Sequence, residues 1–162
     1  MDINYRVHVT PERVFVKVLN KASYLNCEPI RKFFDDQNER GCNNFIIDFD
    51  SCSSMDSTFL GILVSVALKV RKSAECGSFT LLNLRGRNLE TVCNLGIHQI
   101  ADISSDEVND VEELENLSSK PSNLNANAHT IYKAHKALMS LNGKNLRVFS
   151  DVVSYLEQKN ED

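Results

Sequence analysis

The sequence predicts an α/β protein with a mixed β-sheet of four to five strands, helices packed mainly on one face, and a C-terminal helical hairpin. Short apolar or alternating runs predict the strands, and they occur at residues 5–9, 14–19, 45–49, 78–83 and 100–103. Apolar residues spaced by three and four predict helices at 26–39 and 57–74. The strand–helix–strand path from 14 to 49 is a βαβ crossover, which makes its two strands parallel.

The first half of the chain contains clear element boundaries. Strands 5–9 and 14–19 flank a short turn and should form a hairpin. Asn26 is placed to cap the following helix, Pro29 lies in its first turn, and Gly41 should end it.

Composition and charge narrow the class of protein. The chain has 162 residues, 42% hydrophobic and 25% charged, as expected for one globular domain with an appendage or for two small domains. A net charge of -4 gives no reason to expect nucleic acid as a partner. No apolar run approaches the roughly 18–20 residues of a membrane span, and the N-terminus does not resemble a signal peptide.

The cysteines are scattered and odd in number, so they predict free thiols in a reducing cytoplasm rather than a disulfide set. They are Cys27, Cys42, Cys52, Cys76 and Cys93. The four histidines lie elsewhere in the sequence, and we expect neither a metal site nor a cofactor.

Residues 44–66 form the stretch around which the chain is organised. An apolar strand at 45–49 is followed by small polar residues at 50–54, which indicate a loop, and then by helical spacing. Asp56, Ser57 and Thr58 stand where that helix begins, and all three are good cap or first-turn residues. A helix start has unpaired N–H groups and positive dipole character, so it suits a negative group.

The run Met55-Asp56-Ser57-Thr58-Phe59-Leu60-Gly61 resembles the phosphorylation motif of the STAS domain found in bacterial anti-sigma factor antagonists. In that family Asp-Ser-Ser/Thr-Gly-Leu-Gly follows an apolar strand, and the resemblance here covers about residues 5 to 103. It implies that Ser57 accepts a phosphoryl group from a partner kinase, with Thr58 as the fallback. Two positions depart from the family: Phe59 replaces its first glycine, and Ser23 stands where an acidic residue is usual.

The resemblance also implies a function and partners. The unmodified protein would bind a serine kinase that acts as an anti-sigma factor, and a PP2C-type phosphatase would restore it. The implied partner-binding residues come from the motif and from the loop after the second strand: Asp56, Ser57, Thr58, Phe59, Ser23 and Tyr24. The alternative is a structural or scaffold STAS subunit of a larger assembly in which Ser57 is never modified. The motif alone also fits an ordinary α/β domain in which Ser57 simply caps its helix.

No catalytic constellation emerges, and we expect the protein not to be an enzyme. Ser57 has no sequence-evident histidine base, although such a partner can lie anywhere in a chain. The G-x-S-x-G elbow of many serine hydrolases is absent around Ser57.

The last third of the chain divides the protein into three predicted parts: a STAS-like domain at 1–117, a linker at 118–125 and a helical hairpin at 126–162. Residues 104–117 are acidic and predict a short amphipathic helix. The hairpin is too small to fold alone, so it must pack on its own domain, a second copy or a partner. An apolar stripe along its second helix favours a homodimer: Phe149, Val152, Val153 and Leu156.

Overall fold

The computed structural model describes residues 4–73, 77–106, 113–117 and 123–161. Its strands are β1 (Tyr5–Val9), β2 (Val14–Val18), β3 (Asn20–Ala22), β4 (Asn44–Asp48), β5 (Cys52–Met55), β6 (Ser78–Leu82), β7 (Asp102–Ser104) and β8 (Glu115–Asn116). Its helices are α1 (Glu28–Glu39), α2 (Ser57–Lys72), α3 (Gly86–Asn94), the 3₁₀ helix η1 (Ile97–Gln99), α4 (Ala128–Met139) and α5 (Gly143–Glu161).

The main sheet is mixed and has six strands in the order β7-β6-β4-β2-β1-β8. β1 and β2 form the expected antiparallel hairpin, and β2 pairs with β4 in parallel across the α1 crossover. β4 and β6 are also parallel, which places β4 in the middle of the sheet. The predicted α/β class and the central position of strand 45–49 are confirmed.

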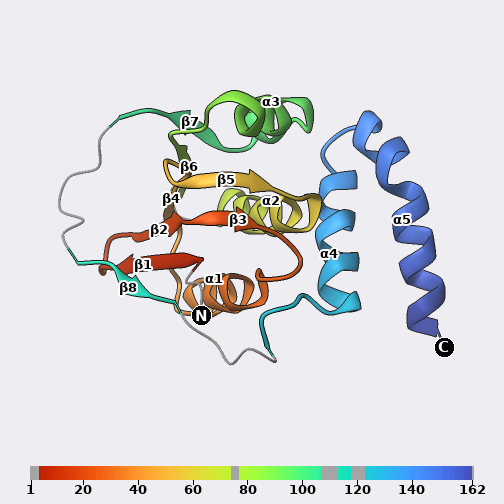
Figure 1. Cartoon of the computed structure of the whole chain (residues 1–162), viewed down its shortest axis with the longest axis horizontal. Helices are drawn as coiled ribbons and strands as arrows, with labels where there is room; N and C mark the ends of the chain where they lie inside the picture. Colours follow the sequence, from red (N-terminus) through yellow and green to blue (C-terminus); the bar gives the residue numbers. More distant parts are fainter. Residues whose placement is uncertain (1–3, 74–76, 107–112, 118–122, 162) are drawn as a thin grey trace.

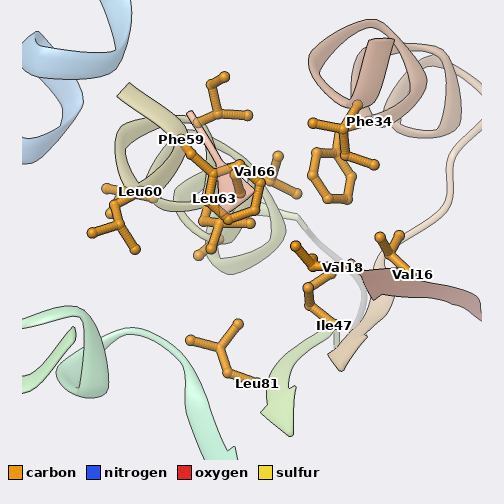
Figure 2. Close-up of a cluster of buried hydrophobic side chains, with 14 of the residues drawn as sticks. Val16, Val18, Phe34, Ile47, Phe59, Leu60, Leu63, Val66 and Leu81 are labelled. Atoms are coloured by element: carbon orange, nitrogen blue, oxygen red, sulfur yellow. The ribbon is translucent and has the colours of Figure 1, made fainter. Parts of the chain in front are cut away.

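The helices lie on one side of the sheet and form successive layers (Figure 1). α1 and α2 are next to the sheet, α4 lies outside α2, and α5 lies outside α4. The core between sheet and helices is apolar, with side chains of α2 facing side chains of the central strands (Figure 2). The residues in this layer include Val16, Val18, Phe34, Ile47, Phe59, Leu63, Val66 and Leu81.

The structure corrects several local predictions. The segment expected to be a loop at 50–54 contains most of β5, which pairs in parallel with β3 in a separate two-stranded sheet. Residues 115–116 form β8 at the edge of the main sheet, not part of a helix, because they pair with β1. The middle of that predicted acidic helix, 107–112, lies outside the described residues. With β8 the sheet exceeds the expected four to five strands.

Asn26 does not cap α1, since the N-cap position is Cys27 and makes no side-chain cap hydrogen bond. Instead the Asn26 side chain accepts from the backbone N–H of Ser23 at 3.0 Å and donates to the carbonyl of Lys21 at 2.7 Å. It therefore holds the loop after β3 in a tight turn.

The predicted C-terminal hairpin is present as α4 and α5. Ala134 and Leu138 of α4 and Val153 and Leu156 of α5 are buried. Asn145 ties the hairpin to α3 as well, since its side-chain amide donates to the carbonyls of Leu95 and Leu138. The hairpin thus packs on its own domain; the division at 118–125 stays a prediction. Among the described residues, no helix is both long enough and apolar enough to span a bilayer.

Candidate functional site

The site is built on the N-terminus of α2, which Asp56 caps. One carboxylate oxygen of Asp56 accepts from the backbone N–H of Phe59 at 2.9 Å, as predicted from its place before the helix. The other oxygen accepts from the backbone N–H of Tyr24 at 2.8 Å. A single carboxylate therefore fixes both the start of α2 and the loop after β3.

This loop and β5 form the rim of the site. The Asp56 N–H donates to the carbonyl of Ala22, and β3 runs beside β5. Tyr24 is 47% exposed and its neighbour Leu25 is also exposed, so two apolar side chains face solvent close to the capped helix. Ser23, where an acidic residue was expected by resemblance, is half-buried and its hydroxyl accepts from the Leu25 N–H. The loop contribution to the site is therefore apolar rather than acidic.

Ser57 occupies the first turn of α2 and is half-buried. Its hydroxyl lies 2.8 Å from Nε2 of His135, which comes from α4. The Nδ1 atom of His135 lies 2.7 Å from the carbonyl oxygen of Ile131. Because a carbonyl only accepts, Nδ1 carries the proton; in the neutral imidazole Nε2 is then the acceptor, and Ser57 donates. Ser57 therefore has a histidine partner that is 78 positions away in sequence.

Two of the predicted partner-binding residues are not on the surface. Thr58, the fallback phosphoacceptor, is 4% exposed, so its hydroxyl is not accessible to a partner kinase in this structure. Phe59 is fully buried and packs between Tyr5, at 6.1 Å between ring centroids, and Phe49, at 6.5 Å. The ring that replaces the family's glycine fills the core and does not project toward a partner. The structure thus brings Asp56, Ser57 and the loop after β3 together at one site. Thr58 and Phe59 are buried and are not part of the exposed surface of that site.

His135 is the residue of the site that the sequence did not assign. It is 4% exposed and its ring contacts Phe149 edge-on, with 5.4 Å between centroids. The available signal was its position on the apolar face of the helix, beside Ile131, Ala134 and Leu138. A histidine on such a face needs a polar partner, but the sequence does not say which one.

Burial keeps the thiols near the site protonated. It raises the pKa of Cys27 to about 12, with the nearby Asp56 and Glu28 carboxylates adding to the shift, and raises the pKa of Cys52 to about 11. Burial also raises the pKa of Tyr5, whose hydroxyl donates to the Asn26 side chain. These three groups are therefore uncharged near neutral pH.

A groove lies between α1, α2 and α4, and its lining includes the buried side chains of Phe34, Ile62 and Ala134 and the exposed residues Lys69 and Lys133. Ser57 and His135 are not among its lining residues. Within the described part of the chain, no group of three or more His, Cys, Asp or Glu side chains could hold a metal ion.

The arrangement of sheet and helices defines the class: this chain has the STAS fold, that of the anti-sigma factor antagonists. It is similar to the anti-sigma factor antagonist SpoIIAA in its unphosphorylated form, with a TM-score of 0.53 and 21% identity over 64% of this chain and 89% of that one. It is also similar to the Bacillus cell fate determinant SpoIIAA in the phosphorylated form, with a TM-score of 0.52 and 20% identity over 63% of this chain and 92% of that one. An anti-sigma factor antagonist from Mycobacterium paratuberculosis is similar with a TM-score of 0.54 and 15% identity over 65% of this chain and 87% of that one.

No family model matches the chain, and no curated protein matches it. The solved structures confirm the predicted resemblance as a resemblance of fold.

Proposed function

We propose that this protein is a phosphorylation-switched binding module of the anti-sigma factor antagonist type. The observation that carries the proposal is the geometry at the start of α2: Asp56 caps the helix and places the Ser57 hydroxyl on its first turn. The exposed side chains of Tyr24 and Leu25 lie next to it and supply apolar contact area. In the unmodified state this surface would bind a regulatory serine kinase.

Phosphorylation of Ser57 would act mainly on the partner. A phosphoserine adds about -1.5 to -2 charge, here directly beside the Asp56 carboxylate. The helix dipole favours a negative group at this end of α2, so the domain itself should tolerate the phosphate. A kinase surface that fits the neutral hydroxyl would meet added charge and bulk, and binding would weaken. A PP2C-type phosphatase would complete the cycle, and an ATP-using kinase implies a cytoplasmic location.

Two substitutions at Ser57 test the proposal. Ser57→Ala should bind the cognate kinase at least as tightly as the unmodified protein, because it can never carry the phosphate. Ser57→Asp should bind at least about tenfold more weakly, the equivalent of about 1.4 kcal/mol. Ser154→Asp is the matched control, since it places the same charge on an exposed serine of α5, outside the loop and β5 that form the rim of the site. Calorimetry or surface plasmon resonance measures all four affinities; equal affinities for the two Ser57 variants would reject the switch.

A second candidate function is supported by the Ser57–His135 hydrogen bond. A serine whose hydroxyl is already paired and half-covered could be a structural residue of a constitutive scaffold subunit. Under this alternative, Ser57 is never modified and the domain serves assembly only. Neither candidate requires the protein to catalyse a reaction, and both are binding functions.

Self-association through the C-terminal hairpin is a further part of the proposal. The stripe expected to meet a second copy faces its own chain for the most part, since Val153 and Leu156 are buried and Phe149 packs against the core. Val152 of that stripe is exposed, as are Val148 and Tyr155 on the same side of α5. We expect a second copy to cover these three exposed side chains, so Val152→Glu should shift the full chain from dimer to monomer. Ser154→Glu, at a neighbouring exposed position, is the control and should leave the dimer intact. Light scattering measures the masses; a monomeric unmodified chain contradicts the dimer.

A further inference from the structure

The C-terminal hairpin lies on the same part of α2 that carries Ser57. α4 packs directly against α2, and α5 packs on α4 from outside (Figure 1). His135 of α4 holds the Ser57 hydroxyl, and the segment leading into α4 is also attached nearby, since the Ala126 N–H donates to the Tyr24 carbonyl at 2.7 Å. The hairpin therefore contacts both the helix start and the loop that form the candidate site.

Gly61 makes this close packing possible. It lies one turn after Ser57, and a Cβ atom placed there would be 2.2 Å from the carbonyl oxygen of Ala134 and 2.5 Å from its carbonyl carbon. Both of these are backbone atoms of α4 and cannot move without moving the helix. Any side chain at position 61 would thus force α4 away from α2, whereas α2 itself would accept alanine readily.

The hydroxyl of Ser57 cannot serve two partners at once. For phosphorylation, Ser57 Oγ attacks the γ-phosphorus of ATP, the bond from that phosphorus to the ADP oxygen breaks, and the hydroxyl proton leaves to a base on the kinase. In the structure the same O–H donates to His135, which is itself buried under Phe149. A kinase can orient this oxygen only after α4 has moved.

We propose that α4 and α5 form an intramolecular cover over the partner-binding surface, fastened by the Ser57–His135 hydrogen bond and by the contact at Gly61. A partner kinase must then compete with the hairpin for the first turns of α2. The inference rests on the proposed function for the identity of that partner, but the cover itself is a property of this chain alone.

Gly61→Ala tests the cover in the full chain. The added methyl group should displace α4, so hydrogen exchange of the amides in α4 should become at least about tenfold faster, while those in β2 and β4 stay unchanged. Gly143→Ala is the matched control, because a Cβ there meets only the end of the Arg147 side chain at 3.7 Å. In the presence of the cognate kinase and ATP, Gly61→Ala should also be phosphorylated at Ser57 several-fold faster than the unmodified protein.

A pair of histidine variants supplies an independent test if Gly61→Ala fails to fold. His135→Ala removes the hydrogen bond to Ser57, and His129→Ala is the control on an exposed position of the same helix. Only His135→Ala should accelerate exchange in α4. The cover is contradicted if α4 exchanges as in the unmodified protein in every folded variant. It is equally contradicted if β2 and β4 accelerate together with α4, because the hairpin would then be an inseparable part of the core.

The two proposals fail in different ways. Faster exchange in α4 without phosphate on Ser57 in any variant supports the cover and contradicts the proposed function. Phosphate on Ser57 at equal rates in all variants, with unchanged exchange in α4, supports the function and contradicts the cover.

Discussion

Replacing Phe59 by alanine is expected to lower the free energy of unfolding by about 3–5 kcal/mol, the usual cost of removing a buried phenylalanine ring. The ring is fully buried and contacts the rings of Tyr5 and Phe49 from the sheet side of α2. Truncation leaves a cavity that a close-packed interior fills only in part. Chemical denaturation monitored by circular dichroism measures the change.

Tyr155→Ala is the control for this prediction, since it also removes an aromatic ring but one that is 58% exposed. Tyr155→Ala should change the free energy of unfolding by no more than about 0.5 kcal/mol, as for most surface substitutions, when the two variants are measured as monomers. A small loss for Phe59→Ala, similar to that of the control, would show that Phe59 does not contribute to the core. The ring would then be available for partner recognition after all.

Asn145→Ala is expected to cost about 1–3 kcal/mol, because buried carbonyl groups lose their donor. The Asn145 side chain is fully buried, and its amide donates to the carbonyl of Leu95 at 2.8 Å and to that of Leu138 at 2.9 Å. These bonds join the start of α5 to α3 and to the end of α4. Asn94→Ala, at an exposed position in the last turn of α3, is the control and should change stability little.

Thermal or chemical unfolding of both asparagine variants provides the measurement. Equal stabilities for the two would mean that the hydrogen bonds of the Asn145 side chain contribute nothing to the folded state.

Elements defined by local pattern were predictable. Each of these features depends on residues close together in the sequence. They are the apolar run of β4, the alternation of β1 and the cap of α2 by Asp56. Because these elements follow in βαβ order, the parallel pairing of β2 and β4 was predictable as well.

Features that depend on distant partners were not predictable. β5 consists of Cys-Ser-Ser-Met and has no strand pattern; it is extended because β3 pairs with it. β8 looked like part of an acidic helix, but pairing with β1 makes it a strand. The Ser57–His135 bond joins residues from two helices, and no local signal specifies which side chain a buried histidine will meet.

The position of Phe59 was ambiguous for a different reason. The family pattern places a glycine there, so a bulky ring suggested a change in the partner surface. The helix turns this position toward the sheet, where Tyr5 and Phe49 accommodate the ring. A departure from a binding motif is therefore explained by packing, and the hydroxyl of Ser57 keeps its place on the first turn of α2.

The most direct measurement of the central claim is the site of phosphorylation. The full chain is incubated with its cognate kinase and ATP, digested, and mapped by tandem mass spectrometry. We predict phosphate on Ser57 and none on Thr58, because the Thr58 side chain is buried. An unmodified chain, or phosphate on the exposed Ser53 or Ser54 with Ser57 unmodified, would contradict the phosphorylation switch and favour the scaffold function.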